Sequence, residues 1–325
     1  MGQVINQDSV GAPAVPATAP NLAIETHNLR KVYGSKVALE DLTIGVPEGE
    51  VFGFLGPNGA GKSTTIKLLL GLAFPTSGSA RLLGQPLGSV AAKRRIGFLP
   101  EQFRFHEWLR GVEFLDFHGE LAGVPRAERR RRIPELLELV GLAGRGNDRL
   151  GGYSKGMLQR IGLAQALIND PALVFLDEPT SALDPIGRRE VRDIIRTLKA
   201  RGMTVFLNSH LLSEVETVCD RVAIVDHGRV VRYGPLEELL RESLDVELVL
   251  GPHDDTLLRR IEEFGVIEAR EHGAHYQVRV RLDSLDDVPA LVDAIARAGV
   301  PIYGATPRRR SLEDVFLGAV EGGTE

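Results

Sequence analysis

The sequence predicts an α/β protein built on a largely parallel sheet, followed by a smaller α+β domain. Three observations predict this fold class. Short apolar runs typical of buried strands alternate with amphipathic runs typical of helices as far as about residue 240. A glycine-rich segment lies between one such strand and the helix that follows it. Beyond Leu240 the order of elements changes to strand, helix, strand, strand, helix and strand.

The first domain is expected over residues 22–242. A tail of residues 1–21 precedes it, rich in Ala, Pro, Gly and Val without any period, and we expect this tail to be flexible. The expected elements are, in order, strands over 23–26, 39–46 and 51–55, a helix over 63–72, helical patterns over 111–121 and 127–140, a helix from residue 154, a strand over 172–176, a helix over 187–201, a strand over 203–207, a helix over 211–220 and a strand pair over 221–232. The arginine run 129–132 lies beside three glutamates in one of these helices and is most simply a solvated face.

The second, accessory domain is expected over residues 243–325. Its expected elements are strands over 246–250, 266–270, 276–281 and 300–305 and helices over 256–264, 288–298 and 312–320. The order βαββαβ is that of a ferredoxin-like domain. Histidines at 253, 272 and 275 could hold a metal ion, but exposed loop histidines on a dimerisation or regulatory domain are the favoured interpretation.

Composition limits the classes of function. At 325 residues the chain has room for two domains. Its formal charge of −5 argues against a dedicated nucleic-acid-binding protein, which usually carries a basic face. The single cysteine, Cys219, excludes an intrachain disulfide framework and fits a reducing cytosol. We expect neither a membrane span, which needs about twenty apolar residues, nor a signal peptide.

The residues GPNGAGKST at 56–64 fit the pattern G-x-x-x-x-G-K-[ST], with a predicted strand before them and a predicted helix after them. Glycines let successive backbone N–H groups converge on a phosphate, and the positive end of the next helix adds to the attraction. Lys62 would reach the terminal phosphates, and the Ser63 hydroxyl would ligate Mg²⁺. A glycine-rich turn that merely carries a lysine is disfavoured by the flanking strand and helix. The predicted phosphate-binding residues are Gly56, Pro57, Asn58, Gly59, Ala60, Gly61, Lys62, Ser63 and Thr64.

The segment ALVFLDEP at 172–179 is an apolar strand that ends in two adjacent carboxylates. Asp177 at the end of the strand could hold Mg²⁺ through water. Glu178 could point at the attacking water as its general base. An ordinary acidic turn is the alternative, and the phosphate loop upstream disfavours it.

Two further segments carry polar groups suited to phosphate. In YSKGMLQR at 153–160, Ser154 is placed to cap a helix and Gly156 leaves backbone amides bare, so this helix start is a second candidate anion site. These residues alone do not decide between such a site, completed by a second copy of the chain, and a simple capped helix. In NSH at 208–210, His210 follows a strand of the parallel sheet and could donate to the γ-phosphate, although a lone histidine is more often structural.

The segments GPNGAGKST, YSKGMLQR, LVFLDEPTSALDP and NSH, in this order and spacing, resemble the nucleotide-binding subunit of an ABC transporter over about residues 22–240. The resemblance implies an ABC cassette with a P-loop NTPase core that is RecA-like, together with a helical subdomain. The order of the motifs and the appended domain look most like the ATPases of drug, polysaccharide and ion exporters, the ABC-2 type. A GTPase is disfavoured because no N-K-x-D motif is present.

The resemblance also implies a role for single residues. Tyr33 would stack on adenine, while Asp177 serves Mg²⁺, Glu178 activates water and His210 senses the γ-phosphate. Two residues of the second motif, Ser154 and Gly156, would complete the site of the other protomer across a head-to-tail ATP sandwich. Asp184, at the end of the segment 181–184, would lie at the same contact between protomers.

The sequence departs from the family pattern in two places. The usual L-S-G-G-Q is Tyr153-Ser154-Lys155-Gly156-Met157 here, which bears on the fine geometry of the contact in trans. The glutamine that senses Mg²⁺ and water in the family falls on Glu101, which would then contribute to both the nucleotide and the metal site. Gln102 is the alternative occupant of that role.

The resemblance further implies partners and a location. ATP and Mg²⁺ are the expected cofactors, with a second ATPase subunit, expected to be identical, and a separate polytopic membrane permease as partners. No nucleic-acid partner is expected, and the chain would lie at the cytoplasmic face of the cell membrane. Candidates for the permease contact are Phe103, Phe105 and Trp108, for which core packing is the alternative. The alternative function is a soluble ABC-type ATPase that is not tied to transport.

Overall fold

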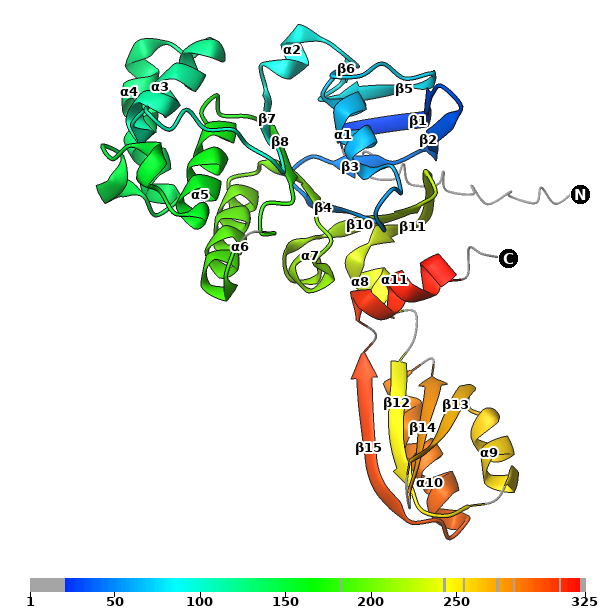
Figure 1. The fold of residues 1–325 in the computed structure, drawn as a ribbon. Helices are drawn as coiled ribbons and strands as arrows, with labels where there is room; N and C mark the ends of the chain where they lie inside the picture. Colours follow the sequence, from blue (N-terminus) through cyan, green and yellow to red (C-terminus); the bar gives the residue numbers. More distant parts are fainter. Residues whose placement is uncertain are drawn as a thin grey trace, which may run out of the picture.

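The structure is a computed structural model that describes residues 21–181, 183–241, 244–253, 255–272, 275–282, 284–309 and 311–321. The predicted tail therefore lies outside the described residues except for Asn21. Figure 1 shows a larger body that carries the parallel strands and most of the helices, and a smaller body below it.

A parallel sheet forms the centre of the larger body. Its strands lie in the order β10-β4-β9-β8-β7, and each neighbouring pair is parallel. They are β4 (Val51–Leu55), β7 (Ile96–Leu99), β8 (Leu173–Asp177), β9 (Thr204–Asn208) and β10 (Arg221–Asp226). The predicted α/β class is confirmed, although β7 was not predicted because its four residues lie within a segment where helical patterns dominate.

Mostly antiparallel strands extend this sheet on the side of β10. They are β1 (Leu22–Tyr33), β2 (Lys36–Leu42), β3 (Gly45–Pro47), β5 (Ser77–Leu82), β6 (Gln85–Pro86) and β11 (Arg229–Pro235). The sequence did not predict β5 and β6. Both are short and largely exposed, so they carry little of the apolar alternation that marks a strand.

Helices cover the two faces of the sheet and form a separate lobe beside it (Figure 1). The lobe contains α3 (Gly111–Leu121), α4 (Arg126–Leu139) and part of α5 (Lys155–Ala166), with 3₁₀ turns at Ala143–Arg145 and Leu150–Gly152. The remaining helices of the larger body are α1 (Lys62–Leu69), α2 (Val90–Lys93), α6 (Pro185–Ala200), α7 (Leu212–Val218) and α8 (Leu236–Arg241).

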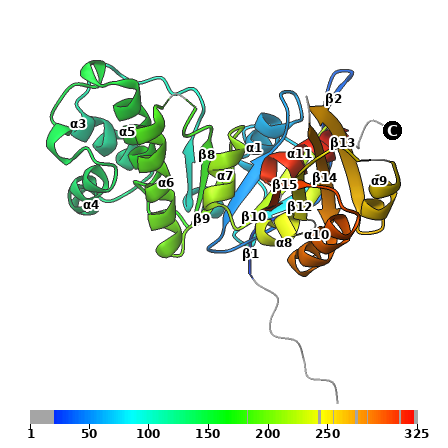
Figure 2. The ribbon, with the colours of Figure 1, turned by 90° about the horizontal axis from the view of Figure 1, so that it is seen from below.

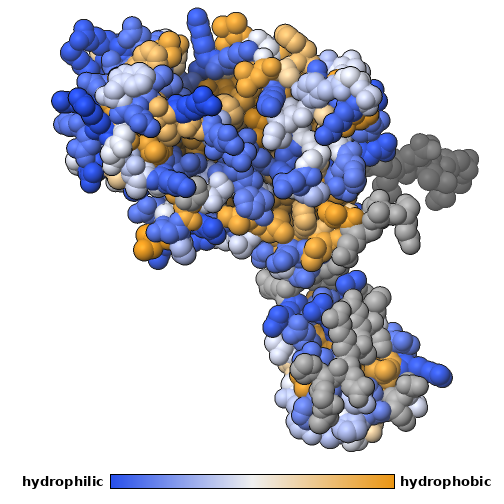
Figure 3. All heavy atoms as spheres, viewed as in Figure 1, coloured by the Kyte–Doolittle hydropathy of each residue, from blue (hydrophilic) through white to orange (hydrophobic). Residues whose placement is uncertain are grey.

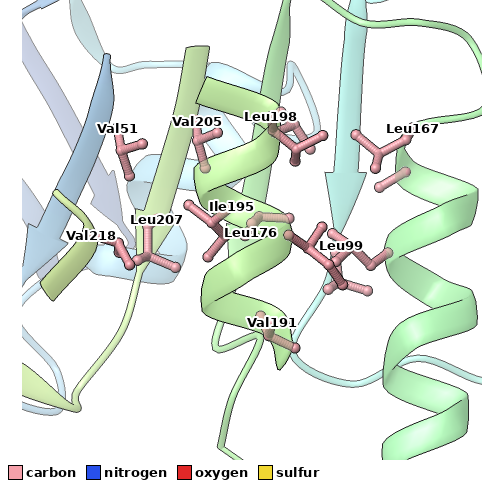
Figure 4. Close-up of a cluster of buried hydrophobic side chains, with 14 of the residues drawn as sticks. Val51, Leu99, Leu167, Leu176, Val191, Ile195, Leu198, Val205, Leu207 and Val218 are labelled. Carbon is pink, nitrogen blue, oxygen red and sulfur yellow. The ribbon is translucent and has the colours of Figure 1, made fainter. Parts of the chain in front are cut away.

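The core of the larger body lies on both faces of the parallel strands. On one face α6 packs Val191, Ile195 and Leu198 against the strands, as Figure 4 shows. The strand residues on that face include Val51, Leu176, Val205 and Leu207. On the other face, rings of neighbouring strands lie 5.1–5.5 Å apart between centroids and pack near α1, namely Phe52, Phe54, Phe175 and Phe206.

The prediction that the arginine run 129–132 is a solvated face is wrong for two of its members. The Arg129 side chain is only 9% exposed; its Nε lies 2.7 Å from Asp116 Oδ1 of α3, and its Nη1 donates to the Val124 carbonyl. Arg132 is also largely buried and donates to the Ile168 carbonyl. The helical period turns these two side chains toward α3 and α5, whereas Arg131 remains exposed.

The smaller body holds a four-stranded antiparallel sheet in the order β13-β14-β12-β15. In chain order its elements are β12 (Leu244–Leu250), α9 (Asp255–Glu262), β13 (Val266–His272), β14 (His275–Leu282), the 3₁₀ turn Leu285–Asp287, α10 (Val288–Arg297) and β15 (Ile302–Arg309). Residues of α9 and α10 pack on one face of this sheet, where they form a core of their own. The order βαββαβ is the predicted one, while the name ferredoxin-like stays a prediction.

The last helix, α11 (Leu312–Glu321), lies on the larger body (Figures 1 and 2). It packs against α7, α8, β10 and β11, with Leu312, Val315 and Ala319 buried in the same core as Val218 and Val222. The Leu312 N–H also donates to Glu216 Oε2 at 2.9 Å. This placement differs from the expected division into residues 22–242 and 243–325, because an amphipathic pattern shows that a helix has an apolar face but not which surface that face covers.

The search for membrane spans covered the described residues, and none of their helices is both long and apolar enough to cross a bilayer.

Candidate nucleotide-binding site

The phosphate loop joins β4 to α1 and makes contacts that only glycine permits at two positions. A Cβ atom on Gly56 would lie 2.3 Å from the Val225 carbonyl oxygen. At Gly61, which caps α1, φ is +105° and a Cβ would lie 2.5 Å from the Ala38 carbonyl oxygen. The loop is therefore held tightly against β2 and β10, with its backbone amides at the start of α1.

Lys62 folds back over this loop. Its Nζ donates to the carbonyl oxygens of Gly56 at 2.7 Å and Pro57 at 3.1 Å. Burial lowers the pKa of Lys62, whereas the charges of three carboxylates raise it: Glu178, Asp177 and Glu101. The lysine thus lies within electrostatic range of the three acidic residues predicted to act at the phosphates and the metal.

Asp177 ends β8 beside the last residue of the neighbouring strand. The two strands are in register, so that Asp177 faces Asn208 at the end of β9. The Asn208 Nδ2 group donates to Asp177 Oδ1 at 2.5 Å. Burial raises the pKa of Asp177, while this hydrogen bond and the charge of Lys62 lower it; the charge of Glu101 raises it further.

Glu178 is buried, and its carboxylate contacts the predicted sensor of the γ-phosphate. His210 Nδ1 lies 2.7 Å from Glu178 Oε2. The backbone of Glu178 has φ of +52°, which is uncommon for a residue other than glycine, and its N–H donates to the Asn208 carbonyl at 2.9 Å. Burial raises the pKa of Glu178, and the charge and hydrogen bond of His210 oppose that rise.

Two further predicted residues lie at the edge of this group. Glu101 is exposed, and its charge raises the pKa values of both Lys62 and Asp177, so it lies within electrostatic range of both residues. Tyr33 at the end of β1 is about half exposed, with Lys31 Nζ 4.6 Å from the centre of its ring. Lys31 thus covers one face of the ring, and an aromatic base could stack on the exposed part of the ring.

The second motif at the start of α5 and the residues at the start of α6 together line a separate hollow of about 430 Å³. Ser154 caps α5 by accepting from the Met157 N–H, and Asp184 caps α6 by accepting from the Gly187 N–H at 2.8 Å. Gly156 lines the hollow between them. The residues described as its lining include none from the phosphate loop, so the predicted site residues form two groups.

Comparison with known proteins identifies the family. The sequence pattern of the family described as ABC transporter matches residues 39–181. An ABC transporter ATP-binding protein of Synechocystis is 43% identical to this chain, over 95% of this chain and 87% of the relative. The chain belongs to the family of ABC transporter ATP-binding proteins. The bacitracin transport ATP-binding protein of Bacillus licheniformis is 36% identical, over 93% of this chain and 98% of that protein.

Solved structures of ABC transporter ATP-binding subunits are similar to about two thirds of this ABC transporter ATP-binding protein. An ATP-binding subunit of an ABC transporter is 33% identical with a TM-score of 0.62, over 67% of this chain and 92% of that one. An ATP-binding cassette solved as a dimer in a post-hydrolysis state with ADP and Pi is 27% identical with a TM-score of 0.59, over 66% of this chain and 98% of that one.

The residues present suit a magnesium ion held together with nucleotide phosphates. Among the described residues, no group of three or more histidine, cysteine or acidic side chains could hold a metal by itself. Mg²⁺ needs fewer protein ligands, because it takes one or two carboxylates with phosphate and water oxygens. The oxygen donors of Ser63, Asp177 and Glu101 fit that requirement.

The sequence interpretation missed one residue of this site. It assigned a role to His210 in NSH but none to Asn208, which contacts both acidic residues at the end of β8, Asp177 and Glu178. The available signal was that the apolar strand β9 ends in a polar residue. In a parallel sheet this end lies beside the end of β8, where the two carboxylates are.

Proposed function

We propose that this ABC transporter ATP-binding protein hydrolyses MgATP and thereby powers a separate membrane permease, most simply that of an exporter. The observation that carries the proposal is the buried Glu178 carboxylate, hydrogen-bonded to His210 and within electrostatic range of Lys62 beside the phosphate loop. A buried carboxylate in that position is suited to take a proton from water.

The side chains act together on the terminal phosphate. Lys62 exchanges the carbonyl oxygens of its own loop for the β- and γ-phosphate oxygens. Glu178 accepts a proton from the attacking water, whose oxygen bonds to the γ-phosphorus as the bond to the β–γ bridging oxygen breaks, which leaves ADP and phosphate. His210 orients Glu178 and donates to the γ-phosphate. A bound magnesium ion would neutralise part of the phosphate charge, with Asp177, Ser63 and Glu101 as its protein-side partners.

The separation of the two groups of site residues supports a head-to-tail dimer. Ser154, Gly156 and Asp184 line a hollow of their own, away from the phosphate loop. A second copy of the chain can bring that hollow over the nucleotide, so that each ATP lies between the phosphate loop of one protomer and the second motif of its partner. The backbone amides at the start of α5 would then face the γ-phosphate.

A cleft of about 710 Å³ supports a permease partner. Its lining comes from α2, β7, α3 and α5 and mixes apolar groups such as Phe98 and Leu121 with Lys93 and Arg94. Figure 3 shows apolar atoms gathered in the hollow near the top of the larger body. The permease would dock there, and its attachment would place the protein at the cytoplasmic face of the membrane.

The three aromatic candidates for this contact differ in their surroundings. Phe103 and Phe105 pack on each other and on Phe114, with centroids 4.5–5.9 Å apart, which supports core packing for both, and Phe103 also lines the cleft. Trp108 is 69% exposed, so its ring is also accessible to a permease.

Glu178→Gln tests hydrolysis and partner together. We expect turnover to fall roughly 10²-fold or more while ATP binding is kept, because the amide cannot accept the proton. We also expect this variant, held in the ATP-bound state and captured from detergent-solubilised native membranes, to bring a polytopic membrane protein that mass spectrometry identifies. Unchanged turnover would remove Glu178 as the base. A ribosomal or DNA-repair partner, or capture of the chain's own copy alone, would favour the soluble ATPase.

A further inference from the structure

Asn208 occupies the last position of β9, on the face of the sheet against which α1 packs. Side chains on one strand point alternately to the two faces, so Asn208 follows Phe206 on the face that packs near α1. On β8, Asp177 follows Phe175 in the same way, and the two phenylalanine rings lie 5.1 Å apart. The pair Asp177 and Asn208 is therefore the next rung of a cross-strand ladder, placed where the apolar core gives way to the phosphate site.

Asn208 contacts both acidic residues through different groups. Its side-chain Nδ2 donates to Asp177 Oδ1, and its backbone carbonyl accepts from the N–H of Glu178. The second contact holds Glu178 in its uncommon backbone conformation, from which the carboxylate reaches His210. One residue thus ties the orientation of one carboxylate to the position of the other.

The side chain is kept in this buried place at a cost to folding. Asn208 is only 2% exposed, and no described residue provides a hydrogen-bond partner for its Oδ1 atom. A buried polar atom without a partner lowers stability, whereas a leucine of similar size would fill the same space without that loss. The amide is thus explained by its contact with Asp177 rather than by packing.

We propose that Asn208 is a positioning residue of the ATPase site, which fixes Asp177 through its amide and Glu178 through its carbonyl for metal binding and for hydrolysis. The proposal rests on the proposed function. Partners that orient a metal-binding carboxylate typically contribute 10- to 100-fold to metal affinity or activity. Without the amide, one buried oxygen of Asp177 has no donor to hold its rotamer, while the backbone bond to Glu178 remains.

The test compares Asn208→Leu with Thr204→Val as a matched control. Thr204 lies on the same strand and the same face, and its Oγ1 accepts from the Gly49 N–H, so its loss removes one hydrogen bond at the far end of β9. Mn²⁺ serves as the metal probe, with its binding in the presence of ATP followed by electron paramagnetic resonance. Binding of ATP in EDTA, turnover and thermal unfolding complete the comparison.

We expect Asn208→Leu to weaken Mn²⁺ binding about tenfold or more while metal-free ATP binding stays within about twofold. Thr204→Val should lower stability without changing Mn²⁺ affinity. Asn208→Ser, whose hydroxyl is too short to replace the amide, should repeat the loss if the leucine variant does not fold. Equal Mn²⁺ affinity in wild type and Asn208→Leu, or an equal loss in Thr204→Val, would overturn the proposal. Failure of the wild type to bind Mn²⁺ with ATP would instead contradict the proposed function.

Discussion

Glu178, the proposed general base, is positioned by its backbone conformation and by its neighbours. A non-glycine residue at φ of +52° costs about 1–3 kcal/mol, which the surrounding contacts must offset. The backbone bond to Asn208, the Ser181 hydroxyl that donates to the Glu178 carbonyl and the contact with His210 supply those interactions. The carboxylate is thereby buried and raised in pKa at the edge of the phosphate site.

The raised pKa of Glu178 predicts how ATP hydrolysis depends on pH. The base must be ionised, so kcat/KM should fall as the pH drops through a pKa that burial holds above the ordinary glutamate value of about 4.3. His210 lowers that pKa, so His210→Ala should move the acid limb to higher pH and reduce the maximal rate. Steady-state rates across pH for the wild type and the variant measure both effects.

Exposed His27 provides the control for this prediction. His27→Ala removes a histidine distant from Glu178 in sequence and contacts, and it should leave the acid limb unchanged. An acid limb that stays in place or moves to lower pH in His210→Ala would show that His210 does not stabilise the ionised carboxylate.

Single residues of the site were predictable where a motif names them. Lys62, Asp177 and Glu178 come together in the structure because each lies at or soon after the carboxyl end of a parallel strand, within a recognisable motif. Asn208 was missed, because its role depends on the register between β8 and β9, and a one-dimensional motif carries no register. The burial of Arg129 was missed for a similar reason, since α3 supplies its partners.

Helices were more predictable than strands at the scale of elements. The pattern over residues 111–121 coincides with α3, because its apolar period is complete within one helix. Strands β5 and β6 depend on neighbours for their hydrogen bonds and have few apolar residues, so their sequences alone resemble loops. For α11, the sequence gives an amphipathic helix, whereas the surface it covers follows from tertiary structure.

The packing of α11 makes a prediction about stability. Val315 is 5% exposed in the core shared with α7 and β10, so Val315→Asp would bury a charge without a partner and should lower the free energy of unfolding by about 3 kcal/mol or more. Leu317 on the same helix is 48% exposed, and Leu317→Asp should change it by less than about 0.5 kcal/mol. Urea unfolding of both variants compares them, and equal values would show that α11 does not contribute to the core.

The whole molecule joins two bodies whose cores are separate. The apolar side chains of β12, β14, α9 and α10 form one cluster, while α11 adds to one of the two clusters of the larger body. The general architecture was predictable because the change of pattern near Leu240 is abrupt. The return of the chain to the larger body was not, since it depends on which apolar surface of the cassette remains uncovered.

The neighbouring positions of β12 and β15 make the smaller body an insertion in the topological sense. Leu244 and Arg309 face each other across an antiparallel pair, which sets their Cα atoms roughly 5 Å apart. The polypeptide therefore departs and rejoins at one spot, and a connection of two or three glycine or serine residues could replace everything between Arg241 and Ser311.

The protein in which this short linker replaces the smaller body should fold and keep its ATPase rate within a few-fold of the full-length chain. Thermal unfolding and phosphate release would measure these two properties. A chain simply cut after Arg241 should be less stable and aggregate, because it also lacks α11 and exposes Val218 and Val222. Comparable behaviour of the two shortened chains would mean that α11 is dispensable. In the expected case, the smaller body is an exchangeable module, which another domain could replace at this one junction while the fold of the larger body is kept.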